Sequence, residues 1–125
     1  MTSFMRLVAM VAKAIPLALL LTGAAMADTY GAIAFSPATG ANSYSYDYAS
    51  RSGAEQRALS ECNKRSRGCR VAIWFKNSCG ALAIGARGWG AGYDASRAAA
   101  EQRAFSQCAS RSGGCRVRVW ACNTR

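Results

Sequence analysis

The chain reads SRSGAEQRALSEC at residues 50–62 and, 46 residues later, SRAAAEQRAFSQC at residues 96–108. The same offset aligns Cys69-Arg70-Val71 with Cys115-Arg116-Val117, and Trp74 with Trp120. One supersecondary unit of this size cannot bury enough surface alone, so two copies are expected to share one core. We therefore interpret the sequence as an internal duplication.

Each copy of the repeated stretch has the features of a helix. Ser50 and Ser96 stand at N-cap positions, where a side-chain oxygen accepts from a free backbone N–H of the first turn. Arginine and glutamate then follow at i,i+4 spacing on the solvent side, as Arg51–Glu55 and Arg97–Glu101. Helical periodicity predicts a buried stripe in each copy, made of Ala54, Ala58, Leu59 and Cys62, and of Ala100, Ala104, Phe105 and Cys108.

Strand-like segments flank both predicted helices, which gives the order strand, strand, helix, strand in each copy. The sequence thus predicts an α+β fold built by internal duplication of a β-β-α-β unit. We expect a six-stranded, mainly antiparallel sheet with two helices on one face, stapled by disulfides. The expected boundaries are one domain over residues 28–125, with repeats at about 30–77 and 79–123.

Alternation along the predicted strands suggests a candidate binding face. The helices are expected to pack on one face of these strands, formed by Val71, Ile73 and Phe75 and likewise by Val117, Val119 and Ala121. The opposite face then carries Arg70, Trp74, Arg116, Arg118 and Trp120. The second strand places Tyr44, Tyr46 and Tyr48 on one of its sides, and the fifth does the same with Trp89, Ala91 and Tyr93. Arginine and aromatic side chains on an open face suit an anionic or ring-bearing partner. The alternative is that these aromatics form a second small core or a dimer contact.

The N-terminus has the layout of a secretory signal peptide over residues 1–27: a basic start, an apolar run and the small-residue site Ala25-Met26-Ala27. A membrane anchor is the alternative, but Lys13 interrupts the apolar run and the remainder is short for a bilayer. We expect export, with the mature protein periplasmic or secreted. Removal of this segment leaves a formal charge of +8, against +10 for the full chain of 125 residues.

All 6 cysteines lie beyond that segment, and an even number in a small exported domain predicts disulfides. Repeat symmetry selects one of the 15 possible connectivities: Cys62–Cys69, Cys108–Cys115 and Cys79–Cys122. The two short loops contribute about 2.5 kcal/mol each and the long one about 4 kcal/mol in the chain-entropy model. A zinc site is the alternative, but the sequence has no Cys-x-x-Cys pair.

The chain has no histidine, which excludes serine–histidine catalysis and histidine metal sites. We predict no metal site, no cofactor and no enzyme activity. The alternative function is an envelope hydrolase that uses Asp47 and Asp94, which are repeat mates. Each aspartate also precedes a helix N-terminus, where an acidic group is favoured for structural reasons.

A candidate basic loop, formed by Lys64, Arg65 and Arg67, follows the first predicted helix, and its copy in the second repeat has fewer charges. A solvated, solubilising loop is the alternative interpretation. With the excess positive charge, this loop favours an anionic component of the cell envelope or an acidic protein as the partner. Nucleic acid is chemically possible as well. We therefore predict a small, basic interaction protein, such as a secreted effector or a periplasmic inhibitor.

The sequence resembles the bacterial family called domain of unknown function 4189 in four features. These are the predicted signal peptide, the Tyr30-Gly31-Ala32-Ile33-Ala34 strand, the duplicated helix and the Cys-Arg-Val…Trp strands. The resemblance covers residues 30–123. It implies a small exported bacterial protein that acts on other cells or on envelope partners. The family has no established catalytic residues, so none is carried over to this chain.

The predicted connectivity is testable by peptide mapping. Digestion of the exported protein without reduction should release the linked pairs Cys62–Cys69, Cys108–Cys115 and Cys79–Cys122, which mass spectrometry identifies. A peptide that links Cys62 to Cys108 would contradict the assignment by repeat symmetry.

Overall fold

The computed structural model describes residues 26–125, and the predicted signal peptide, residues 1–27, falls almost wholly outside the described residues. The first half comprises β1 (Tyr30–Phe35), β2 (Asn42–Tyr48), α2 (Arg51–Asn63) and β3 (Arg70–Lys76). The second comprises β4 (Cys79–Ile84), β5 (Trp89–Asp94), α3 (Arg97–Ala109) and β6 (Arg116–Cys122). Each half has the predicted order, so the α+β class and the duplicated β-β-α-β unit are confirmed.

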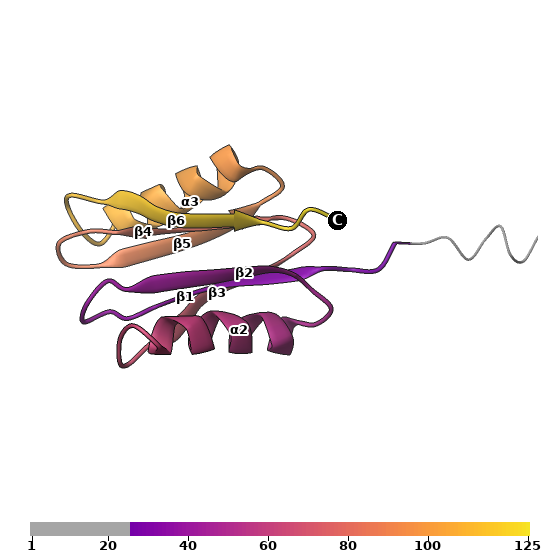
Figure 1. The fold of residues 1–125 in the computed structure, drawn as a ribbon. Coiled ribbons are helices and arrows are strands. Elements are labelled where there is room, and N and C mark those ends of the chain that lie inside the picture. Colours follow the sequence, from indigo (N-terminus) through magenta and orange to yellow (C-terminus); the bar gives the residue numbers. More distant parts are fainter. Residues whose placement is uncertain (1–25) are drawn as a thin grey trace, which may run out of the picture.

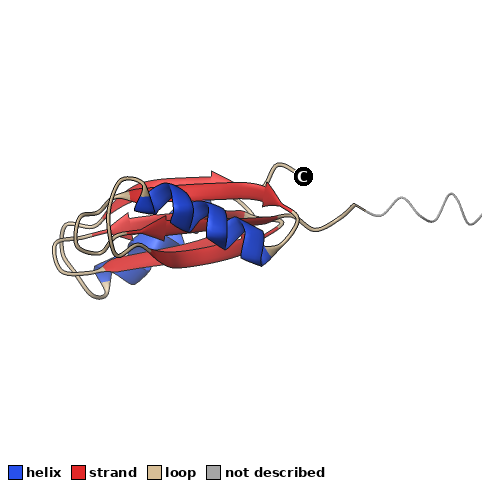
Figure 2. Cartoon of the chain, turned by 60° about the horizontal axis from the view of Figure 1, so that its bottom comes forward, coloured by secondary structure: helices blue, strands red, loops and turns tan. Residues whose placement is uncertain are grey.

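The strands form two sheets rather than one. Both sheets are antiparallel and three-stranded, in the orders β2-β1-β3 and β5-β4-β6. They pack face to face, and α2 and α3 cover the two outer faces (Figures 1 and 2). The expected single six-stranded sheet with both helices on one face is therefore wrong. The central strands explain why: β1 and β4 are buried along almost their whole length, which requires cover on both faces.

Small side chains let each helix lie close to its sheet. In the first half Ala54, Ala58 and Cys62 of α2 are buried against alanines of β1, and the equivalent residues of α3 are buried against β4. The hydroxyls of Ser43 and Ser45 on the edge strand β2 donate to the carbonyl oxygens of Ala58 and Ala54. One predicted member of the buried stripe is misplaced, since Phe105 is 47% exposed.

A second core fills the space between the sheets. It is made of larger side chains, namely Ile33, Phe35, Phe75, Leu82 and Ala121. The ring of Phe75 covers glycine backbone in both central strands, because a Cβ on Gly31 or Gly80 would come within 2.3 or 2.4 Å of that ring. The repeat mate of Phe75 is Ala121, so one large and one small residue share the centre of the molecule.

Local irregularities change the predicted faces of the strands. Ile73, Phe75, Val119 and Ala121 lie in the core between the sheets and not against the helices, as expected from alternation. Val117 does pack on the α3 side, because the register of β4 and β6 shifts between Leu82 and Ala83. In β2 a bulge at Asp47, with φ of 61°, turns Tyr48 toward α2 and away from the face of Tyr44 and Tyr46.

Three disulfides pair Cys62 with Cys69, Cys79 with Cys122, and Cys108 with Cys115, the connectivity that repeat symmetry predicts. The first and third join the end of each helix to the start of the next strand. Such bonds persist in oxidising surroundings, which indicates a location outside the cytoplasm. Over residues 26–125 the structure contains no helix that is both long and apolar enough to span a membrane.

The close packing of α3 yields a stability prediction. A Cβ on Gly90 would lie 2.3 Å from the Cys108 nitrogen and 2.6 Å from the Ala104 carbonyl oxygen, both helix backbone atoms that cannot move aside independently. Gly90→Ala should therefore lower the free energy of unfolding by about 1–3 kcal/mol in urea titrations. Gly113→Ala is the control, since a Cβ there meets nothing within 4 Å. Equal stability of the two variants would contradict the close approach.

Candidate functional site

Ion pairing divides the charged side chains into two sets. All 6 Asp and Glu side chains of the chain form ion pairs: Asp28 with Lys76, Asp47 with Arg125, Glu55 with Arg51, Glu61 with Arg57 and Lys64, Asp94 with Arg103, and Glu101 with Arg97. These pairs use seven of the fourteen basic side chains in residues 26–125. The other seven have no carboxylate within 4 Å among the described residues, and all seven are arginines.

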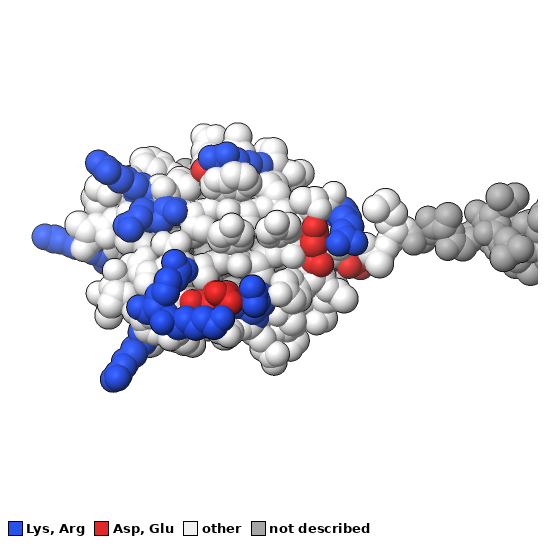
Figure 3. All heavy atoms as spheres, in the orientation of Figure 1, with Lys and Arg blue, Asp and Glu red and all other residues white. Residues whose placement is uncertain are grey.

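These seven arginines gather at one end of the molecule, which we call the arginine pole. They are Arg65, Arg67, Arg70, Arg87, Arg111, Arg116 and Arg118. They come from the α2–β3, β4–β5 and α3–β6 loops and from the first residues of β3 and β6, which all meet at the left end in Figure 1. On the face shown in Figure 3, basic side chains project from this end, whereas the acidic groups in view lie against basic ones.

Contacts with edge-strand backbone and with Trp89 order part of the pole. Arg111 donates to the Trp89 carbonyl oxygen at 3.3 Å, and Arg65, its repeat mate, donates to the Asn42 carbonyl oxygen. The guanidinium of Arg70 lies 5.6 Å from the centre of the Trp89 ring, within the range of a cation–π contact. Arginines held in this way lose less side-chain entropy when they bind a ligand.

The predicted binding face does not exist as one surface. Trp74 and Trp120 lie on the two outer sides, where Arg51 and Arg97 of the first helical turns stack on them at 4.4 and 3.9 Å. The three arginines of that face, Arg70, Arg116 and Arg118, belong to the pole instead. The reason is that the second sheet covers the side of Ile73, Phe75 and Val119, which leaves Trp74 and Trp120 on the sides that carry the helices.

The predicted basic loop is also divided. Lys64 is ion-paired to Glu61 at 3.0 Å, whereas Arg65 and Arg67 join the pole. Sequence reasoning missed two pole members, Arg87 in the glycine-rich hairpin and Arg111 in the second repeat. The available clue was topological and limited to the second half, because a β-β-α-β order places the β4–β5 and α3–β6 loops at the same end of that half.

The two aspartates proposed for catalysis are held in separate hydrogen-bonded pairs. Asp47 accepts hydrogen bonds from the Thr124 hydroxyl and from the Thr124 backbone N–H, the latter at 2.8 Å, and these bonds hold the pKa of Asp47 below its usual range. A hydrogen bond from Arg103 at 2.7 Å lowers the pKa of Asp94 in the same way. A general acid needs a raised pKa, so these environments favour a structural role.

The described residues offer few side chains that are free to bind a metal ion. No group of three or more His, Cys, Asp or Glu side chains in residues 26–125 is placed to hold a metal ion. The cysteines of this part of the chain are all in disulfides, and its carboxylates are in ion pairs.

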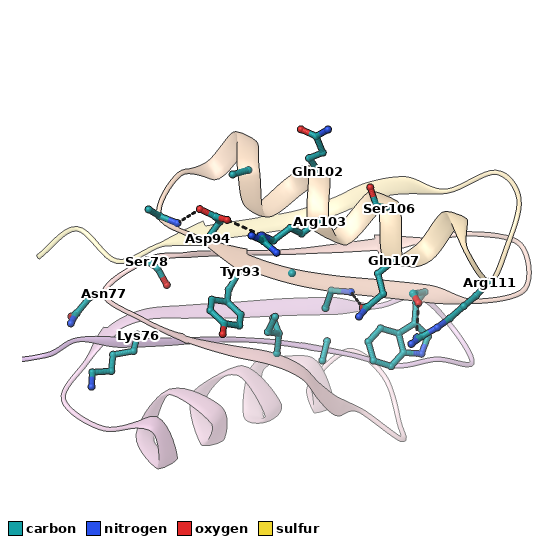
Figure 4. A pocket seen from close by; sticks show the side chains of 17 residues that line it. Lys76, Asn77, Ser78, Tyr93, Asp94, Gln102, Arg103, Ser106, Gln107 and Arg111 are labelled. Atoms are coloured by element: carbon teal, nitrogen blue, oxygen red, sulfur yellow. Dashed lines mark hydrogen bonds and ion pairs between the residues drawn. The ribbon is translucent and has the colours of Figure 1, made fainter.

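Two open grooves follow the free edges of the two sheets. The larger, of about 1210 Å³, follows β5 between α3 and β3, and the smaller, of about 680 Å³, follows β2 beside α2 (Figure 4 shows the larger). They occupy equivalent places in the two halves, because β2 pairs with β1 as β5 pairs with β4. Hence Asn42 and Trp89 are equivalent, as are Glu61 and Gln107.

The family described as Domain of unknown function (DUF4189) matches residues 30–122. The chain belongs to this family. The comparison of the DUF4189 chain with curated proteins gave no significant match.

Among solved structures, the NMR structure of Rv1813c from Mycobacterium tuberculosis is similar to the DUF4189 chain. The sequences are 33% identical, the match covers 76% of this chain and 75% of the other, and the TM-score is 0.56. Neither the family description nor this similarity assigns an activity.

The lowered pKa of Asp94 predicts a pH dependence of stability. A carboxylate whose pKa is lower in the folded than in the unfolded state stabilises the fold above about pH 4, and this contribution is lost as pH falls through the folded pKa. Asp94→Asn should therefore be less stable than the wild type at pH 7, and the difference should shrink toward pH 2 in urea titrations. A difference that stays constant from pH 7 to pH 2 would contradict this role of Asp94.

Proposed function

We propose that this protein is an exported interaction protein that binds an anionic partner through the arginine pole. The single observation that carries the proposal is the sorting of charge: all Asp and Glu side chains are ion-paired, whereas seven arginines at one end are not. Unpaired like charges held together cost energy through mutual repulsion. A bound anion removes that cost.

The use of arginine alone indicates the chemistry of the partner. The guanidinium group is planar, stays charged at every physiological pH and donates two parallel hydrogen bonds to phosphate or carboxylate. The pole presents such groups from three loops and two strands, so it suits a partner with several anionic groups. An anionic component of the bacterial envelope has this character, as has an acidic protein surface.

The proposed location agrees with this partner. Three disulfides support an oxidising, extracytoplasmic compartment. Residues 1–27 are proposed to act as a cleaved signal peptide, with the mature protein in the periplasm or secreted. Within these compartments the protein acts as a secreted effector or as a periplasmic inhibitor of an envelope enzyme.

Binding is favoured over hydrolysis by the positions of the two aspartates. Asp94 lies at the β5 groove, whereas Asp47 lines neither the β5 groove nor the β2 groove. Each carboxylate is already engaged by its own donor. A pair of catalytic acids has to face one substrate bond from both sides.

Charge removal at the pole tests the proposal. Replacing Arg87, Arg116 and Arg118 by Gln should weaken binding of long-chain inorganic polyphosphate about tenfold or more, measured by calorimetry at 50 mM salt. The dependence of the dissociation constant on salt should become less steep, since fewer counterions are released.

The control removes the same charge elsewhere. Replacing Arg57, Lys76 and Arg125, which are all ion-paired, by Gln should change the affinity less than threefold. Equal losses in the two triple variants would show that only net charge matters, and the pole would then not be a site.

A further inference from the structure

The groove along β5 differs from the arginine pole in its chemistry. It begins at the pole, where Trp89 and Arg111 lie, and runs along β5 to Tyr93 and the Asp94–Arg103 pair. Figure 4 shows Tyr93 reaching from β5 toward the sheet of β3, while Gln107 points from α3 to β5. The groove thus presents aromatic rings and polar side chains along one open path.

The backbone of this edge is partly occupied. The side-chain oxygen of Gln107 accepts from the Ala91 N–H at 2.8 Å, and Arg111 donates to the Trp89 carbonyl oxygen at 3.3 Å. A peptide that extends the sheet as an additional strand needs such groups free. The groove is therefore suited to recognition by side chains, with the Gln107 amide hydrogens and the Tyr93 hydroxyl as available hydrogen-bonding groups.

Charge is unevenly distributed along the groove. At the end away from the pole, Arg103 is neutralised by Asp94 at 2.7 Å and Lys76 by Asp28 at 3.5 Å. Arg111, at the pole end, has no carboxylate partner among the described residues. A chain with a negative charge on every unit gains little along such a path, whereas a neutral polar chain with an acidic group at the pole end fits it.

We infer that the β5 groove binds an oligosaccharide that places an acidic group against Arg111. Aromatic rings such as Tyr93, which is 61% exposed, pack on the C–H faces of sugar rings, and amide groups bond the sugar hydroxyls. The groove volume of about 1210 Å³ has room for more than one ring, since small-molecule pockets hold about 300–1,000 Å³. The inference rests on the proposed function, because Arg111 belongs to the pole, and it names the partner as an acidic glycan.

The equivalent groove along β2 provides an internal comparison. There Asn42 replaces Trp89, and Glu61 replaces Gln107. The Glu61 carboxylate adds a negative charge and holds Arg57 at 3.1 Å and Lys64 at 3.0 Å. That groove therefore lacks the indole ring, and it places the Glu61 carboxylate beside Arg65, the repeat mate of Arg111, although its strand and helix are arranged alike.

The test is an NMR titration of the exported, disulfide-bonded protein with two defined sugars. One is a hyaluronan tetrasaccharide, which carries carboxylates, and the other is chitotetraose, which is neutral. The acidic sugar should shift the amide resonances of residues 89–94 and of Gln107. It should bind about tenfold more tightly than the neutral one, because only its carboxylate bonds Arg111.

Matched variants connect binding to this groove. Gln107→Glu keeps the acceptor for the Ala91 N–H but adds the charge found in the β2 groove, and Tyr93→Ala removes an exposed ring; each should weaken binding about tenfold. The controls Glu61→Gln and Tyr46→Ala alter the equivalent positions of the other groove and should stay within twofold of the wild type.

The outcomes separate the two proposals. Shifts restricted to the pole loops, or equal losses in both sets of variants, would overturn the groove inference and leave the pole standing. No binding of either sugar at millimolar concentration would overturn it too. Groove shifts with a tetraglutamate peptide but not with hyaluronan would replace the glycan by an acidic peptide. The proposed function is tested separately, by polyphosphate binding to the pole variants. Its failure is therefore distinguishable from failure of the groove inference.

Discussion

The contact of Phe75 with both central strands is the constraint on which the arrangement of the two halves depends. Its ring lies against Gly31 of β1 and Gly80 of β4, where any Cβ would collide with it. The sheets can therefore approach face to face around one aromatic ring. Because Ala121 is small, the equivalent place in the other half leaves room for that ring.

Face-to-face packing has two consequences for function. Each helix is placed on an outer face, and the loops that follow the helices meet the two hairpin loops at one end (Figure 1). Loops from different parts of the chain thus bring their arginines together in the arginine pole, while the Asp and Glu side chains are engaged in ion pairs. The tryptophans that a single open sheet would display are instead stacked under Arg51 and Arg97.

Duplication followed by divergence explains how one scaffold holds two different edges. Ser43 and Ser45 bond the carbonyls of α2, whereas glycines at the equivalent positions of β5 let α3 come closer. The exchange of Glu61 for Gln107 removes a charge and frees an amide that covers the β5 edge. Such differences between equivalent positions show which residues the fold does not require, because it tolerates either residue.

The sequence by itself determined the local structure of this protein: the helices capped by Ser50 and Ser96, the order of elements and the repeat-related cysteines. These features depend on residues close in the chain or related by the repeat, so spacing reveals them. Alternation along β3 and β6 predicted the wrong partners for Ile73 and Val119, because a strand pattern shows which side is apolar but not what covers it. Only the tertiary structure decided that the sheets cover one another and that Arg87 and Arg111 join the other pole arginines, since both results depend on contacts between halves that no periodicity encodes.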